Sequence, residues 1–110
     1  HMRFDVLGQV QIHSVWRLRP MLLRELSLEG FSLESTTPFE LNTVFKFRLG
    51  VDGERRSIVV QARAVHCTLI SVTADIPLYV AGFQLVGATD AVRAEMQHLV
   101  EYAEWLWRQE

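Results

Sequence analysis

The sequence has little of what defines several large classes of protein. Its single cysteine, Cys67, excludes an internal disulfide framework and a cysteine-rich zinc site. No apolar run approaches the roughly 18 residues that a membrane-spanning helix needs. The N-terminus lacks the apolar stretch of a signal peptide. We therefore expect a soluble, cytoplasmic protein that is not inserted into a membrane.

Basic charge is also scarce. The 11 Lys and Arg residues are outnumbered by 13 Asp and Glu residues, which gives a formal net charge of −2. This balance argues against a general nucleic-acid binder, so we expect no DNA partner. Lys46 is the only lysine, and every other basic residue is arginine. Arginine suits bidentate contacts with phosphate or guanine, but a coding bias toward arginine gives the same composition.

Patterns that indicate catalysis are missing as well. The sequence has neither a glycine-rich phosphate loop nor a G-x-S-x-G elbow. Cys67 and His66 are neighbours on a predicted strand, so they point to opposite faces and cannot act together as nucleophile and base. His13, His66 and His98 lack the spacing of metal ligands. We predict no enzyme, no catalytic residue, no bound metal and no cofactor.

The composition that is present is typical of one globular domain. The chain has 110 residues, of which 49% are hydrophobic and 22% charged. A chain of this length can bury a core without disulfides or metals. His1 and Met2 resemble a cloning remnant, so we expect a single domain over residues 3–110.

Hydrophobic residues alternate with polar ones through the first 86 residues, which predicts strands. In the segment after Val44, this alternation directs Phe45, Phe47 and Leu49 inward. Asp52-Gly53 is typical of a hairpin turn, and Gly82 suggests a bulge or a close approach of two backbones. The strands are expected at 4–13, 21–26, 31–34, 44–51, 57–69 and 79–86, with connections that include 16–20, where Pro20 argues against a central strand, and loops at 35–38 and 73–77.

The spacing of the hydrophobic residues changes after residue 88, and the new spacing predicts one helix. Thr89 or Asp90 is suited to cap it, and it is expected to end near Gln109. One stripe should dock on the sheet: Val92, Met96, Leu99, Val100, Ala103, Leu106 and Trp107. The predicted helix carries three further residues on a different side, away from this stripe: His98, Tyr102 and Trp105. The predicted fold class is mainly β, a six-stranded antiparallel barrel with a C-terminal α-helix.

The segment Arg24–Phe31 joins two of these strands. As a plain hairpin turn, it would use Ser27 to bond the backbone and Gly30 to adopt a positive φ. The sequence ELSLEGFSL also resembles the D/N-x-S-x-x-G turn of PilZ domains. Further segments are similar to the family's later elements in order and spacing: PFELNTVFKFRL, VVQARAVHC, YVAGFQLV and the closing helix.

This resemblance implies a PilZ-like barrel and a non-enzymatic receptor for cyclic di-GMP in bacterial signalling. In that family an R-x-x-x-R stretch grips phosphates and guanines, and the turn offers polar groups to a guanine edge. Carried over to matching positions, the expected ligand-binding residues are Arg3, Glu25, Ser27 and Gly30.

The sequence departs from the family pattern in two places. No two arginines are four positions apart, and Arg3 stands where the second arginine of R-x-x-x-R would fall. Glu25 replaces Asp or Asn, which lengthens the side chain by one methylene. Two hypotheses therefore stand side by side. One is a module that binds cyclic di-GMP and relays this to a partner or a neighbouring domain. The other is a degenerate PilZ-like domain that binds protein through His98, Tyr102 and Trp105.

Overall fold

The computed structural model describes residues 10–14, 20–51 and 57–108. It contains six strands followed by one helix. The strands are β1 (Val10–Ser14), β2 (Pro20–Leu26), β3 (Gly30–Ser35), β4 (Val44–Val51), β5 (Ser57–Thr73) and β6 (Ile76–Leu85), and the helix is α1 (Asp90–Arg108). The predicted class, mainly β with a C-terminal helix, is confirmed.

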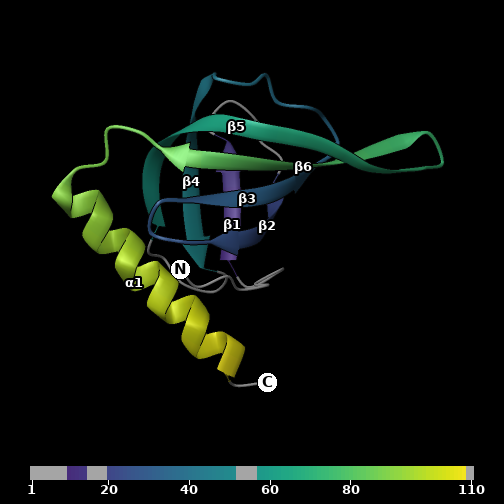
Figure 1. The fold of residues 1–110 in the computed structure, drawn as a ribbon. Coiled ribbons are helices and arrows are strands. Elements are labelled where there is room, and N and C mark those ends of the chain that lie inside the picture. Colours follow the sequence, from purple (N-terminus) through teal and green to yellow (C-terminus); the bar gives the residue numbers. More distant parts are fainter. Residues whose placement is uncertain (1–9, 15–19, 52–56, 109–110) are drawn as a thin grey trace.

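All neighbouring strands are antiparallel, and the sheet curls into a closed barrel in the order β1-β2-β3-β6-β5-β4 (Figure 1). The pairing of β1 with β4, which includes Ile12 opposite Leu49, closes the ring. The last strand, β6, lies between β3 and β5. Of the two strands that flank the predicted turn, β3 therefore has β6 as its second neighbour, rather than β4, which follows it in sequence.

The barrel interior is filled by alternate residues of the strands. Phe47 and Leu49 of β4 are buried, as their alternation predicts, while Lys46 and Arg48 are exposed. Phe83 of β6 packs at the centre of an aromatic cluster, and its ring centroid lies 4.8 Å from that of Phe47. The cluster also contains Phe31, Phe39 and Phe45. Such aromatic contacts favour one arrangement of the core.

Three register shifts interrupt the alternation. In β2 the register against β3 shifts between Leu23 and Glu25. Leu23 and Leu26 are consequently both buried although they are three residues apart, a spacing that a regular strand does not allow. In β5 the register against β6 shifts between Ala64 and His66. These two shifts lie beside the turn that the sequence analysis singled out. The third shift, between Leu69 and Ser71, lies farther along β5.

The expectation of a loop over residues 73–77 is wrong. β5 continues to Thr73 and β6 begins at Ile76, so only Ala74 and Asp75 form the connection. Their φ angles of 50° and 63° are those of a two-residue hairpin turn. The hairpin extends beyond the rest of the barrel (Figure 1), and we call residues 65–78 the arm.

Pro20 is also placed differently from the expectation. It is the first residue of β2, opposite His13 of β1. The pairing of β2 with β3 begins only at Leu22, so the ladder with β3 does not reach Pro20. The expected strand at residues 4–9 and the Asp52-Gly53 turn lie outside the described residues.

Helix α1 begins after Thr89, whose Oγ1 accepts a hydrogen bond from the N–H of Val92 at 3.2 Å. Its apolar stripe docks as predicted: Met96, Leu99, Val100 and Ala103 are buried and Val92 is half-buried. The side chains of Leu106 and Trp107 lie outside the described part. Tyr102 also packs against the core, so its expected position away from the docked stripe is wrong.

No helix among the described residues is long and apolar enough to span a lipid bilayer.

Candidate functional site

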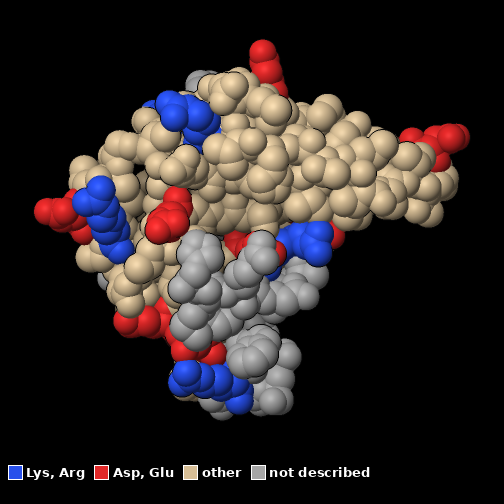
Figure 2. Space-filling view, in the orientation of Figure 1, with Lys and Arg blue, Asp and Glu red and all other residues tan. Residues whose placement is uncertain are grey.

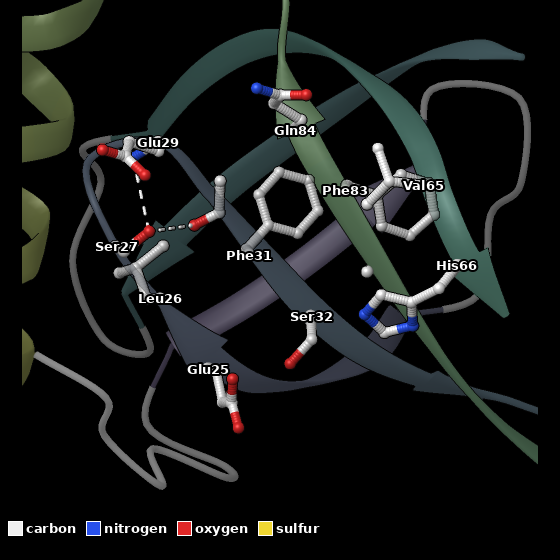
Figure 3. A pocket seen from close by; sticks show the side chains of 12 residues that line it. Glu25, Leu26, Ser27, Glu29, Phe31, Ser32, Val65, His66, Phe83 and Gln84 are labelled. Carbon is white, nitrogen blue, oxygen red and sulfur yellow. Dashed lines mark hydrogen bonds between the residues drawn. The ribbon is translucent and has the colours of Figure 1, made fainter. Parts of the chain in front are cut away.

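The turn between β2 and β3 is held by Ser27. Its backbone N–H donates to the carbonyl of Gly30 at 2.9 Å. Its hydroxyl accepts the N–H of Glu29 at 3.3 Å and donates to the Gly30 carbonyl at 3.3 Å (Figure 3). The prediction that Ser27 stabilises the turn through backbone bonds is confirmed.

Gly30 is needed for a different reason from the one expected. The glycine with a positive φ in the described chain is Gly87, not Gly30. A Cβ at Gly30 would lie 2.0 Å from the carbonyl oxygen of Phe83. The turn can approach β6 this closely only because residue 30 has no side chain. The N–H of Leu85, which donates to the Glu29 carbonyl at 2.9 Å, ties the turn to the same strand.

A row of residues crosses four strands beside this turn. Glu25 of β2 pairs with Ser32 of β3, Ser32 pairs with Gly82 of β6, and Gly82 pairs with His66 of β5. The bulge in β2 places Glu25 next to Leu26, which points into the core, so the carboxylate belongs to the outer surface. The row therefore brings a carboxylate, a hydroxyl and an imidazole to one surface (Figure 3).

The imidazole of His66 covers Gly82. A Cβ at Gly82 would meet Nε2 of His66 at 2.1 Å and two carbons of the ring at 2.6 and 2.7 Å. These three similar distances place the ring over the glycine. An irregularity does lie opposite Gly82, between Ala64 and His66 of β5. The expected close approach of a second backbone is wrong, because the group that approaches the glycine is a side chain.

These residues surround a pocket of about 360 Å³, which we call the turn pocket. Its polar side chains come from four strands and the turn, and Ser32 is 92% buried at its floor, since only 8% of it is exposed. The turn pocket is lined by Glu25, Leu26, Ser27, Glu29, Gly30, Phe31, Ser32, Val65, His66, Gly82, Phe83 and Gln84. Two of these residues are acidic and none is Lys or Arg, so the described lining supplies no cation for an anionic ligand.

The structure brings together three of the four ligand residues predicted from the sequence. Glu25, Ser27 and Gly30 all line the turn pocket, whereas Arg3 lies outside the described residues. Ser32, His66 and Gln84 were missed as site residues. Their signal is weak because they lie far apart in sequence, and only the insertion of β6 between β3 and β5 makes them neighbours.

The residues predicted to bind a partner are on α1. His98 is exposed, and Trp105 is 55% exposed. The ring of Trp105 lies 5.9 Å from that of Tyr102, which is anchored against the core. A second hollow, of about 260 Å³, separates α1 from the turn and is lined by Glu29, Glu101 and Glu104 among others. Helix and turn are thus close neighbours.

Within the described residues, no group of three or more His, Cys, Asp or Glu side chains is placed to hold a metal ion. Cys67 is half-buried and unpaired as a thiol.

No family model matches the sequence, and neither does any curated protein. Solved structures do match. The PilZ domain with c-di-GMP of YcgR from Escherichia coli superposes with a TM-score of 0.70 and 13% identity, covering 99% of this chain and 95% of that one. The PilZ domain of CeSA from a cellulose-synthesizing bacterium gives a TM-score of 0.56 and 16% identity, covering 94% and 99%. The chain therefore has a PilZ-like fold.

Proposed function

We propose that this chain is a non-enzymatic PilZ-type module that binds cyclic di-GMP in the turn pocket. The observation that carries the proposal is the pocket itself. It is built on the Glu25-x-Ser27-x-x-Gly30 turn, which is the part of the sequence that resembles the ligand turn of PilZ domains. The similar fold of a PilZ domain solved with c-di-GMP supports it. A cytoplasmic location is part of the same proposal.

The polar groups of the pocket suit a guanine base. A carboxylate accepts hydrogen bonds, so Glu25 is assigned to the N–H groups of the guanine edge. The hydroxyl of Ser32 and the amide of Gln84 are further partners for its polar atoms. The hydroxyl of Ser27 is engaged with the turn, so its role is to position the loop.

The phosphates of the ligand require cations that the described lining does not contain. We assign this role to Arg3, because arginine forms bidentate contacts with phosphate. Replacing Arg3 with alanine should therefore weaken binding by one to two orders of magnitude, the effect of about 1.5–3 kcal/mol for a charge-assisted hydrogen bond.

A calorimetric titration of cyclic di-GMP into the chain tests the proposal. Saturable binding at micromolar concentration is expected. Glu25→Gln should weaken it at least about tenfold, because the amide can no longer accept at both atoms. Glu40→Gln, at an exposed acid away from the pocket lining, is the matched control and should bind like the wild type. A folded wild-type chain that gives no heat at high micromolar ligand contradicts the proposal.

The signal would be relayed by a change in the surface around the pocket. The turn and α1 border a common hollow. A ligand that moves the turn would therefore change the surface that α1 exposes beside this hollow. Such a shift requires that the ligand binds one arrangement more tightly than the other.

A second candidate function is binding of a protein partner or a neighbouring domain without a nucleotide. The observation that favours it is Trp105, which is 55% exposed and whose ring centroid lies 5.9 Å from that of Tyr102, a residue packed against the core. Exposed aromatic residues with a rigid support are common at interface hot spots. A silent titration together with a partner affinity that falls on Trp105→Ala, with folding still cooperative, would establish this function. An unchanged affinity for the partner would exclude it.

A further inference from the structure

A second row of residues crosses the outer surface beside the turn pocket. Gly30 of β3 pairs with Gln84 of β6, and Gln84 pairs with Arg63 of β5. Residues that lie directly opposite each other in an antiparallel pair share one face of the sheet. Because Gln84 lines the turn pocket, Arg63 lies on the same face as the pocket, one strand beyond this part of its lining.

Little separates Arg63 from the turn in this row. Neighbouring strands are about 5 Å apart, so the Cα atoms of Arg63 and Gly30 are about 10 Å apart. Gly30 has no side chain, and Gln84 is the residue between the two. The long side chain of an arginine can therefore extend over Gln84 toward a ligand held at the turn.

Basic residues are scarce around the pocket. Strands β2, β3, β5 and β6 contain two Lys or Arg residues, Arg24 and Arg63. Arg24 is half-buried in the bulge of β2, next to Glu25. The arm, which continues the strand of Arg63, contains neither Lys nor Arg, and Figure 2 shows it as an almost uncharged extension with acidic atoms at its tip. Arg63 is therefore the basic residue on the β5 side of the pocket.

The guanidinium of Arg63 is available to a ligand. The side chain is exposed, and the described part of the chain offers it no hydrogen-bond or ion-pair partner. Arg48, an exposed arginine of β4, instead donates to the hydroxyl of Ser57 at 3.2 Å. A guanidinium presents N–H donors in a planar fork that matches two oxygens of a phosphate. Arg63 can thus bind an anion without first breaking an internal contact.

We propose that Arg63 is a further ligand-binding residue, whose guanidinium forms a bidentate contact with a phosphate of the nucleotide. This inference rests on the proposed function, because it adds a residue to the same site. Glu25 and Arg63 lie on β2 and β5, at opposite ends of the strand order β2-β3-β6-β5, which is about 14 Å or three strand spacings. The carboxylate accepts the N–H groups of a base at one end, and the guanidinium binds a phosphate toward the other.

The ligand has a use for a second arginine. Both phosphates of cyclic di-GMP are negatively charged, and Arg3 can form a bidentate contact with only one of them. The sequence contains no two arginines four positions apart, so the second arginine cannot come from an R-x-x-x-R stretch of this chain. Arg63 supplies it from a distant strand, where it faces the acidic side chains of the pocket across β6 and β3.

Calorimetric titration of cyclic di-GMP into Arg63→Gln tests this contact. The dissociation constant should rise at least about tenfold, because a charge-assisted bidentate contact is lost. Arg48→Gln is the matched control, since it removes the same charge from an exposed strand position outside the pocket lining, and it should bind like the wild type. If the wild type binds and Arg63→Gln binds equally well, this inference is overturned and the proposed function stands. A folded wild type that gives no heat overturns both.

The salt dependence of binding separates a phosphate contact from a structural role. The dissociation constant of the wild type should rise with sodium chloride concentration, because salt screens the attraction between an exposed arginine and a phosphate. The rise should be shallower for Arg63→Gln, whereas a structural effect would weaken binding equally at every salt concentration. Equal salt dependence of the two proteins overturns the inference.

Arg63→Lys tests what the ligand recognises at this position. Lysine keeps the charge and loses the fork, so its affinity should lie between those of the wild type and Arg63→Gln. A lysine variant that binds no better than the glutamine variant contradicts a phosphate contact. Thermal unfolding of the variants checks that each is folded, and all should resemble the wild type because position 63 is exposed.

Discussion

Gly30 and Gly82 at the turn pocket each leave room for a neighbour, but the neighbours differ in kind. At Gly30 the neighbour is the carbonyl of Phe83, a backbone atom fixed in the ladder between β3 and β6. At Gly82 the neighbour is the ring of His66, which can rotate away. One glycine is therefore required by the fold, and the other sets the position of a pocket side chain.

Gly30→Ala should be strongly destabilising. Its Cβ would lie 2.0 Å from the Phe83 carbonyl oxygen, so two strands must separate. We expect a loss of at least about 1–3 kcal/mol in the free energy of unfolding, the usual effect of overpacking, measured by urea denaturation. Gly87→Asn is the control: Gly87 has a φ of +60°, which asparagine tolerates, and open space around it. A Gly30→Ala variant as stable as Gly87→Asn would show that the strands adjust freely.

Gly82→Ala should instead act through His66. The added methyl group displaces the ring, which changes the pocket while the barrel remains intact. The two side chains should therefore be coupled in a double-mutant cycle of unfolding free energies. Gly82→Ala should cost less in a His66→Ala background than in the wild type, by about 0.5 kcal/mol or more. Additive effects would mean that the ring does not rest on the glycine.

At the scale of elements, regular alternation could be predicted and its interruptions could not. The buried faces of β4 and of the first half of β5 follow directly from period two, as Phe47 and Val60 show. The bulge after Leu23 was not predicted, although Leu23 and Leu26 at a spacing of three are its signature in the sequence. The Ala74-Asp75 turn was missed because neither residue is the glycine that φ values above zero usually require.

The residues of the candidate site likewise divide into those that a local pattern predicts and those that it does not. Ser27 and Gly30 could be predicted because they lie within one short motif, whose turn depends on local hydrogen bonds. Ser32 and His66 could not, because each looks like an ordinary strand residue until β6 is inserted between their strands. Pairing between distant segments depends on the whole barrel, which a local pattern does not encode.

Thr89 determines where α1 begins. Thr89→Ala removes the oxygen that accepts the N–H of Val92, and about 1 kcal/mol of stability should be lost. Thr89→Ser keeps the hydroxyl and should unfold within a few tenths of a kcal/mol of the wild type. Thermal unfolding followed by circular dichroism compares the two. If serine and alanine are equally destabilising, the hydroxyl is not the cap.

At the scale of the whole molecule, the barrel has one core, and Phe47 is the largest fully buried side chain among the described residues. Its ring contacts Phe31 and Phe83, which come from two other strands. Phe47→Ala should cost about 3–5 kcal/mol. This is a large part of the roughly 5–15 kcal/mol by which a domain of this kind is stable.

Equilibrium denaturation measures this loss, with Phe45→Ala as the comparison. Phe45 is half-buried at the margin of the same cluster, so its truncation should cost clearly less. Equal losses would indicate that the cluster is not organised around Phe47.

The position of β6 in the barrel also determines when the turn pocket can exist. The strands that carry Glu25 and Ser32 are synthesised early, but the strand that joins them to His66 is made only after residue 75. A nascent or proteolytically shortened chain that ends before β6 has the turn motif and no pocket. The proposed ligand could therefore bind only to a chain that has been synthesised through β6.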